Sequence, residues 1–82
     1  MYWELIHRAE QLADELRKIM RLIECYGTDE QFSKAQDDED TIFNLLWTVD
    51  HLDCLEPWSV QLDLDEAEFL INELCEEFSW IA

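Results

Sequence analysis

The residues best suited to catalysis are scarce in this sequence, and their spacing forms no catalytic motif. The histidines, His7 and His51, lie far apart, and the serines are Ser33, Ser59 and Ser79. None of these serines stands in the sequence of a nucleophile elbow, and a single glycine leaves no glycine-rich phosphate loop. Carboxylates are abundant, but no pair is marked out as a general acid in an apolar pocket. We therefore predict that the chain is not an enzyme and has no catalytic residues.

Metal binding is a second, weaker interpretation of the histidines, cysteines and carboxylates. His51 and Cys54 are three residues apart and share one helix face, as two metal ligands can. Cys25 and Cys75 could complete the site only from other segments, and no cysteine pair has the close spacing of a structural zinc site. The acidic run at 37–40 lacks the glycine and distal glutamate of a calcium-binding loop. We expect no metal, no cofactor, and buried, reduced cysteines.

Charge is the strongest feature of the composition. The chain has 21 acidic residues against 5 basic ones, a formal net charge of -16. Residues 1–21 contain equal numbers of each sign, so the whole excess lies in residues 22–82, where Lys34 is the one base. Such a surface aids solubility, but its self-repulsion costs stability in a small domain. It excludes direct binding to nucleic acid or to an anionic membrane, because both need a basic patch.

The first third of the chain has the periodicity of a helix. Apolar residues recur every three or four positions over 2–26, which predicts one continuous helix with Gly27 at its C-terminal end. Thr28 and Gln31 then have the spacing of a capping box, which predicts the start of a second helix.

The middle of the chain allows two interpretations. The four adjacent carboxylates at 37–40 suit a helix N-terminus, where the dipole is positive, better than a helix interior. We therefore expect a break there, followed by a helix over 40–55 that Pro57 ends. A continuous helix over 28–55 is the main alternative.

The last part of the chain changes pattern at Pro57. Apolar and polar residues alternate over 58–64, which predicts an extended segment near 57–64 lying on the helices. Asp65 and Glu68 then have the spacing of an N-cap and its N3 acid, so the last helix is expected to begin at Asp65. The predicted fold class is all-α: a single acidic domain over 1–82, folded as a compact bundle of three to four helices.

The termini and apolar runs bear on location. No apolar run approaches the roughly 20 residues that cross a bilayer. The first residues lack the basic start and apolar run of a signal peptide. We expect a cytoplasmic protein, and the sequence leaves its oligomeric state open.

The four tryptophans divide by position. Trp47 lies beside core positions of the middle helix and is predicted to be structural. Trp3, Trp58 and Trp80 lie near the chain ends or the extended segment. Each of these three either packs at the edge of the core or, if exposed, is an anchor for a protein partner, because tryptophan dominates interface hot spots.

The acidic residues themselves form the candidate binding surface. On the last helix, Glu66, Glu73 and Glu77 form one stripe, and carboxylates one or two turns apart are separated by about 5–11 Å. Phosphates on one DNA strand have a spacing of the same order, one per about 3.4 Å of axis. The predicted partner is therefore a nucleic-acid-binding protein or complex with a basic groove. The predicted contacts are Asp37, Asp38, Glu39, Asp40, Asp50, Asp53, Glu56, Asp63, Asp65, Glu66, Glu68, Glu73, Glu76 and Glu77.

In size, single-domain build and these acidic residues, the chain resembles the small acidic DNA-mimic inhibitors of phages and mobile elements, including anti-CRISPR and anti-restriction proteins. That resemblance implies an inhibitor that occupies the DNA-binding groove of a host defence enzyme, in the host cytoplasm if the chain is phage-encoded. The segment 65–70, Asp-Glu-Ala-Glu-Phe-Leu, also looks like an acidic helix start of the immunity proteins of nuclease bacteriocins. The alternative function is an antitoxin, immunity or adaptor module that binds a protein partner through an apolar patch.

Overall fold

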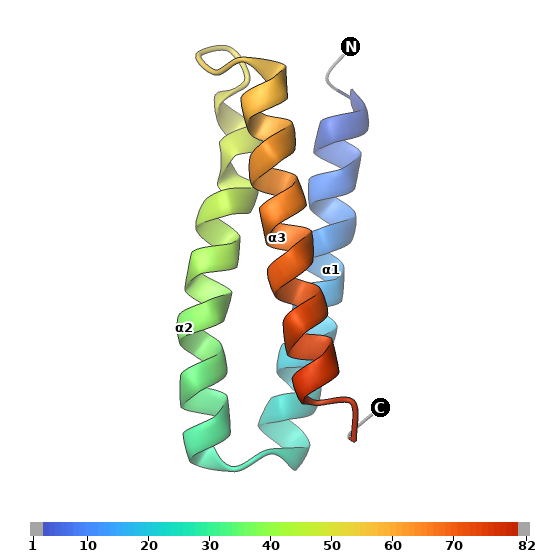
Figure 1. The fold of residues 1–82 in the computed structure, drawn as a ribbon, viewed down its shortest axis with the longest axis vertical. Helices are drawn as coiled ribbons and strands as arrows, with labels where there is room; N and C mark the ends of the chain where they lie inside the picture. The colour runs from blue at the N-terminus through green and yellow to red at the C-terminus, as the bar shows by residue number, and fades with distance from the viewer. Residues whose placement is uncertain (1–2, 81–82) are drawn as a thin grey trace.

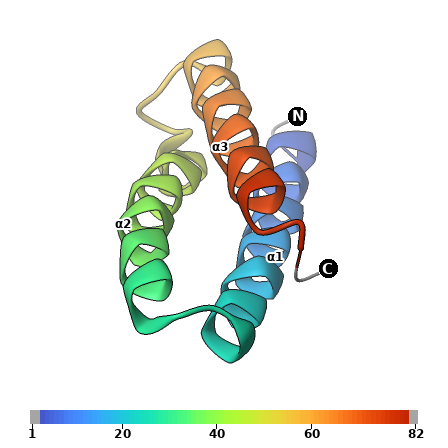
Figure 2. The same ribbon diagram turned by 60° about the horizontal axis from the view of Figure 1, so that its bottom comes forward.

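Three long helices lie side by side in a computed structural model that describes residues 3–80. Helix α1 spans Trp3–Tyr26, α2 spans Asp29–Leu46, and α3 spans Pro57–Glu77. A short 3-10 helix, η1 (Trp47–His51), extends the end of α2. The chain runs down α1, up α2 and down α3, so neighbours in sequence are antiparallel (Figures 1 and 2). Within residues 3–80 there is no strand, and the all-α fold class is confirmed.

Helix α1 follows the predicted periodicity. It begins at Trp3, and the predicted start at Tyr2 lies outside the described residues. At its end the Gly27 amide donates a hydrogen bond to the Ile23 carbonyl oxygen at 2.7 Å. A Cβ atom on residue 27 would stand 2.7 Å from that same oxygen, closer than real contacts allow. Glycine is therefore required here by the close approach of the backbone.

Helix α2 begins at the predicted capping box. The Gln31 amide donates to Thr28 Oγ1 at 3.1 Å, and the Thr28 amide donates to Gln31 Oε1 at 2.9 Å. These two bonds satisfy amide groups that have no partner inside the helix. The sequence therefore predicted this helix start correctly.

The expected break at 37–40 is wrong, because α2 continues through these residues to Leu46. Ala35, Ile42 and Leu46 are buried on one side of the helix, and a break would remove this side from the core. Successive helical residues turn by about 100°, so the four carboxylates point in different directions and are not packed together. The alternative, a continuous helix over 28–55, is correct in that one helix passes through the acidic run. Its predicted end is wrong, because the helix changes to 3-10 geometry at Trp47 and ends at His51.

The predicted extended segment near 57–64 and the helix start at Asp65 are also wrong, because α3 begins at Pro57. Proline suits the first helical position, since its fixed φ is helical and it needs no amide partner. The amides of Ser59 and Val60 donate to the Glu56 carbonyl at 3.0 and 3.2 Å and close the first turn. The alternation over 58–64 therefore occurs within a helix and not in an extended segment.

The core is a continuous apolar column between the three helices. Its side chains are almost all aliphatic, and every long helix contributes to it. The buried residues are Ala9, Leu12, Leu16, Ile19, Met20, Ile23, Ala35, Ile42, Leu46, Val60, Leu64, Ala67, Ile71, Leu74 and Phe78. No polar or charged residue among those described is buried. No helix in the described part of the chain is long and apolar enough to cross a membrane.

Candidate functional site

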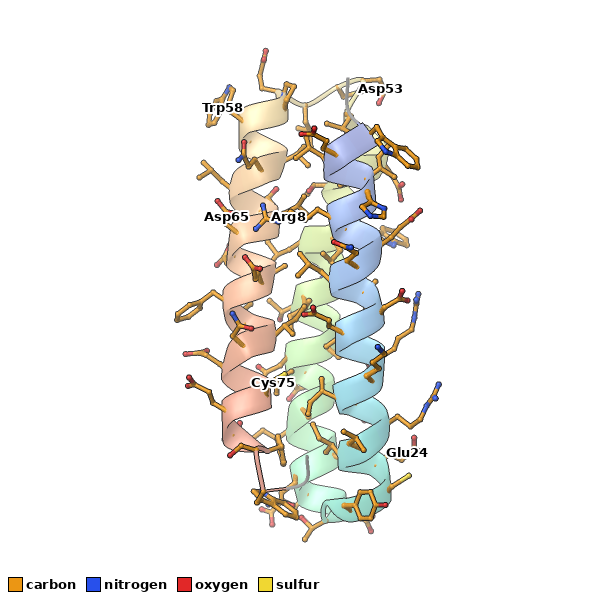
Figure 3. The ribbon with its side chains drawn as sticks, turned by 90° about the vertical axis from the view of Figure 1, so that its right-hand side faces the viewer. Arg8, Glu24, Asp53, Trp58, Asp65 and Cys75 are labelled. Atoms are coloured by element: carbon orange, nitrogen blue, oxygen red, sulfur yellow. The ribbon has the colours of Figure 1, made fainter. Side chains whose placement is uncertain are left out.

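The predicted acidic contacts all lie at the surface of the bundle. Eleven of the fourteen are exposed, and the other three, Asp38, Glu39 and Asp63, are half-buried. They lie on α2, on η1, on the η1–α3 connection and on α3, and Figure 3 shows Asp53 at the end of the bundle where that connection runs. Helix α3 contributes seven carboxylates and no base, whereas four of the five basic residues are on α1. The fold therefore separates one mixed-charge helix from two acidic ones.

The carboxylates of α3 are divided between its two flanks. Arg8 of α1 lies within 2.7 Å of Asp65 and 3.0 Å of Glu68, so these two acids lie on the α1 side (Figure 3). These hydrogen bonds, foremost the one to Asp65, raise the pKa of Arg8. The predicted contact surface is therefore partly neutralised along this flank.

The other flank of α3 carries the predicted glutamate stripe. Glu66, Glu73 and Glu77 are exposed and, by helical geometry, point about 130° away from the Arg8-bound pair. Among residues 3–80, none of these three forms an ion pair. These three glutamates are therefore accessible at the surface. The fourteen predicted contacts as a whole do not lie on one face.

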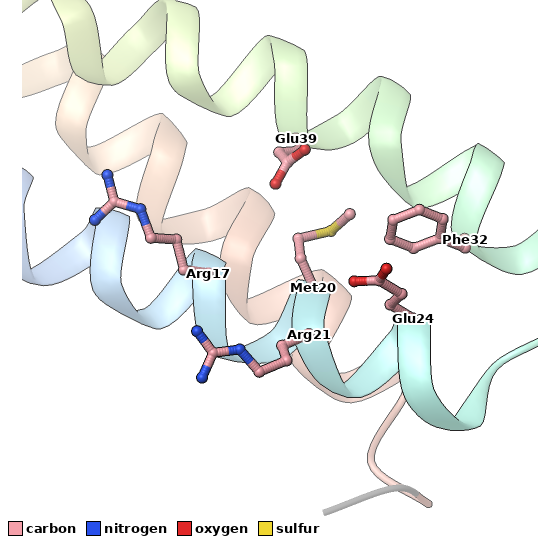
Figure 4. Close-up of a pocket in the computed structure, with 6 residues that line it drawn as sticks. All are labelled: Arg17, Met20, Arg21, Glu24, Phe32 and Glu39. Carbon is pink, nitrogen blue, oxygen red and sulfur yellow. The ribbon is translucent and has the colours of Figure 1, made fainter.

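A shallow groove between α1 and α2 has mixed charge (Figure 4). Its volume is about 250 Å³, and it is lined by Arg17, Met20, Arg21, Glu24, Phe32 and Glu39. Burial raises the pKa of Glu39, and the charge of Asp40 raises it further. In Figure 4 the two arginine side chains extend away from Glu39, so this carboxylate faces the groove without a cation beside it.

All four tryptophans are exposed, each by more than half of its surface. The prediction that Trp47 is structural is wrong, because Leu46 fills the core and the next residue turns outward as the 3-10 helix begins. Trp3 stacks on His7 with 5.8 Å between ring centroids, and Trp80 lies 6.3 Å from the buried Phe78 ring. Tryptophans with this exposure are candidates for contact with a partner.

The cysteines are free but not buried. Cys25, Cys54 and Cys75 are all exposed, which corrects the expectation of buried thiols. Burial of part of its side chain, with a smaller effect of Glu15, raises the pKa of Cys75. Within residues 3–80, no three His, Cys, Asp or Glu side chains are grouped so that they could hold a metal ion.

An apolar stripe on the outside of α3 was not predicted. Trp58, Leu62 and Phe69 are 64%, 59% and 61% exposed, although each is large and apolar. Their spacing of four and seven residues places them on one side of the helix. Val60 and Leu64, between them in sequence, are fully buried on the opposite side. This arrangement produced the alternation over 58–64, which comes from two apolar sides of a helix and not from a strand.

Comparison with known proteins gives no further guide. No protein-family model, curated protein or solved structure matches this chain. The surface itself is therefore the basis for a functional proposal, and its two notable features are the unpaired carboxylates and the exposed apolar residues.

Proposed function

We propose that this protein is an inhibitor that binds the basic nucleic-acid-binding groove of a partner by presenting carboxylates in place of phosphates. The observation that supports this proposal is the charge carried per length of the bundle. The molecule is 41 Å long and has a net charge of -16. A DNA duplex of this length carries about 24 phosphates, since one charge occurs per roughly 1.7 Å of axis. The protein therefore has about two-thirds of the linear charge density of DNA.

The arrangement of the charges supports the same function. The elongated bundle, 41 × 19 × 15 Å, lets carboxylates recur along its length as phosphates do along a strand. The strongest contacts are expected from the glutamate stripe of Glu66, Glu73 and Glu77, which no ion pair among residues 3–80 neutralises. Asp65 and Glu68 contribute less, because Arg8 already binds them.

An activity of this kind fits the anti-CRISPR and anti-restriction inhibitors of phages. In this proposal the partner is a DNA- or RNA-binding enzyme in the host cytoplasm, and inhibition is competitive with nucleic acid. Association is fast and depends steeply on salt, because it is driven by long-range attraction between opposite charges.

A capture experiment with matched charge variants tests the proposal. The tagged protein is exposed to a bacterial lysate, and bound proteins are eluted with rising NaCl, with and without excess duplex DNA. The test variant is Glu66→Gln/Glu73→Gln/Glu77→Gln on α3. The control is Glu4→Gln/Glu10→Gln/Glu15→Gln, which removes three exposed charges from the mixed-charge helix α1. Glutamine preserves helix propensity in both variants.

We expect nucleic-acid-binding enzymes to elute at moderate salt and to be displaced by DNA. The α3 variant should release them at lower salt than the α1 control does. A partner that survives both high salt and DNA, or equal elution from the two variants, contradicts mimicry.

A second candidate function is an antitoxin, immunity or adaptor module that selects its partner through an apolar patch. The observation that favours it is the exposed stripe of Trp58, Leu62 and Phe69. It predicts a captured partner that resists salt and DNA and is lost when this stripe is made polar.

A further inference from the structure

Helix α3 has two apolar sides, and the bundle uses only one of them. Val60, Leu64, Ala67, Ile71 and Leu74 are buried against α1 and α2. The outer stripe is defined here as Trp58, Leu62 and Phe69, and by helical geometry it points about 180° from that buried side. Figure 3 shows Trp58 on the side of α3 that faces away from α1. The fold itself therefore gives these three large side chains nothing to pack against.

The charges around the outer stripe indicate what kind of partner can bind there. Asp65 and Glu66 lie between Leu62 and Phe69 along the helix, and Glu73 and Glu76 follow Phe69 by one and two turns. All four carboxylates are exposed, and α3 contains no basic residue. An apolar row bordered by carboxylates is complementary to an apolar row bordered by lysine or arginine.

A second copy of the chain has the wrong charge for this position. Two α3 helices packed along their outer stripes bring Asp65, Glu66, Glu73 and Glu76 of each copy together, and α3 itself supplies no base to pair with them. The rest of the surface adds to this repulsion, since each copy carries a net charge of -16. An anionic membrane is repelled for the same reason.

The shape of the outer stripe indicates a helical occupant. Anchors four and seven residues apart along one side of a helix are the pattern by which amphipathic helices recognise one another or a groove. Packed helices approach to about 8–10 Å, which lets lysines on the incoming helix reach Glu66 and Glu73 beside the apolar contact.

We infer that the outer stripe of α3 is a docking site for a basic amphipathic helix of a partner protein. Trp58, Leu62 and Phe69 contact its apolar face. The bordering carboxylates that Arg8 does not bind, Glu66, Glu73 and Glu76, pair with its lysines and arginines. The inference rests on the proposed function in one respect only, which is that the partner is positively charged. It adds that charge alone does not define the partner and that the contact includes apolar anchoring on α3.

Two synthetic peptides test this site directly. One is a helix of about five turns with leucine on one face and lysine on the other. The second has the same composition and charge in an order that forms no apolar face. Binding of each is measured by calorimetry in about 0.15 M NaCl, where long-range attraction is screened. The amphipathic peptide is expected to bind at least about tenfold more tightly than the second peptide.

Matched variants then assign the site. Leu62→Gln/Phe69→Gln makes two of the three residues of the outer stripe polar without changing charge, and it should abolish the tenfold preference. Trp3→Gln/Trp47→Gln removes two equally exposed aromatic residues from α1 and η1 and should retain it. Circular dichroism should show that both variants remain helical, as expected for substitutions at exposed positions.

The outcomes separate the two proposals. If Leu62→Gln/Phe69→Gln keeps the tenfold preference, or Trp3→Gln/Trp47→Gln loses it, the docking site is not the outer stripe. Mimicry is tested separately, by the glutamate variants in the capture experiment. If the protein sediments as a dimer that Leu62→Gln/Phe69→Gln dissociates, the stripe binds a second copy and the inference is wrong. If the peptide binds as expected but the charge variants do not alter capture, the docking site remains and mimicry is lost.

Discussion

The guanidinium of Arg8 on α1 lies 2.7 Å from the carboxylate of Asp65 on α3, and the same nitrogen donates to Glu68 at 3.0 Å. These two contacts of Arg8 are the only ion pairs between different helices in the described residues. They join the first and last helices near the end of the bundle where α3 begins (Figure 3). In a protein with a net charge of -16, these contacts are specific attractions between opposite charges.

Loss of these contacts should lower stability by about 1 kcal/mol, because partly exposed ion pairs are individually weak. We expect Arg8→Gln to be less stable in urea unfolding than Lys18→Gln, which removes the same charge from an exposed position on the same helix. Equal losses in the two variants would show that net charge matters and this geometry does not.

The two sides of α3 provide a test of its helical register. Leu64 is fully buried, so Leu64→Ala should cost roughly 2–5 kcal/mol in free energy of unfolding. Leu62 is largely exposed, and Leu62→Ala should change stability by no more than about 0.5 kcal/mol. Comparable losses at both positions would favour an extended segment with both residues on its apolar side.

Glu39 predicts a pH dependence of definite sign. Its pKa is raised in the folded state, so the folded protein binds this proton more readily than the unfolded chain does. Its contribution to stability is therefore present below the ordinary value of 4.5 and is lost as the pH rises through the raised pKa.

Replacing this carboxylate should accordingly stabilise the protein at neutral pH. Glu39→Gln is expected to raise the free energy of unfolding at pH 7 by less than about 1 kcal/mol, because solvent screens a half-buried group. Its advantage over the wild type should shrink as the pH falls toward 4.5. Glu73→Gln, at an exposed position on α3, is the control, and an equal gain from it would assign the effect to general repulsion.

Salt should stabilise the whole domain. Repulsion among the carboxylates that give the net charge of -16 is screened by added ions, with a Debye length of about 8 Å at 0.15 M. We expect Tm to rise by about 5 °C between very low salt and 0.15 M NaCl, which is roughly 1 kcal/mol for a domain of this size. A Tm that falls steadily with NaCl would show that ion pairs such as Arg8–Asp65 outweigh the repulsion.

Features that depend on nearby residues could be predicted from the sequence. Helix α1 and the Thr28–Gln31 capping box follow from periodicity and spacing over a few residues, and the separation of charge between residues 1–21 and 22–82 is a property of composition. The surface position of the acidic contacts follows as well, because a small core cannot accommodate unpaired charge.

Features that depend on which helix faces which could not be predicted. The alternation over 58–64 fits an extended segment with one apolar side and equally a helix with two, Trp58 and Leu62 on one side and Val60 and Leu64 on the other. It does not show which of these forms, or which side of the helix is buried. The choice depends on contacts with α1 and α2. The same contacts hold α2 together through its acidic run.

The sequence by itself therefore determined that this protein is helical, small and strongly acidic, because these properties sum over local residues. Only the tertiary structure decided that Arg8 neutralises Asp65 and Glu68, that all four tryptophans are exposed, and that α3 keeps an unused apolar side. The physical reason is that burial and pairing arise between segments distant in sequence. They follow from the packing of three apolar helix faces into one core, because this packing determines which side chains outside the core lie next to one another.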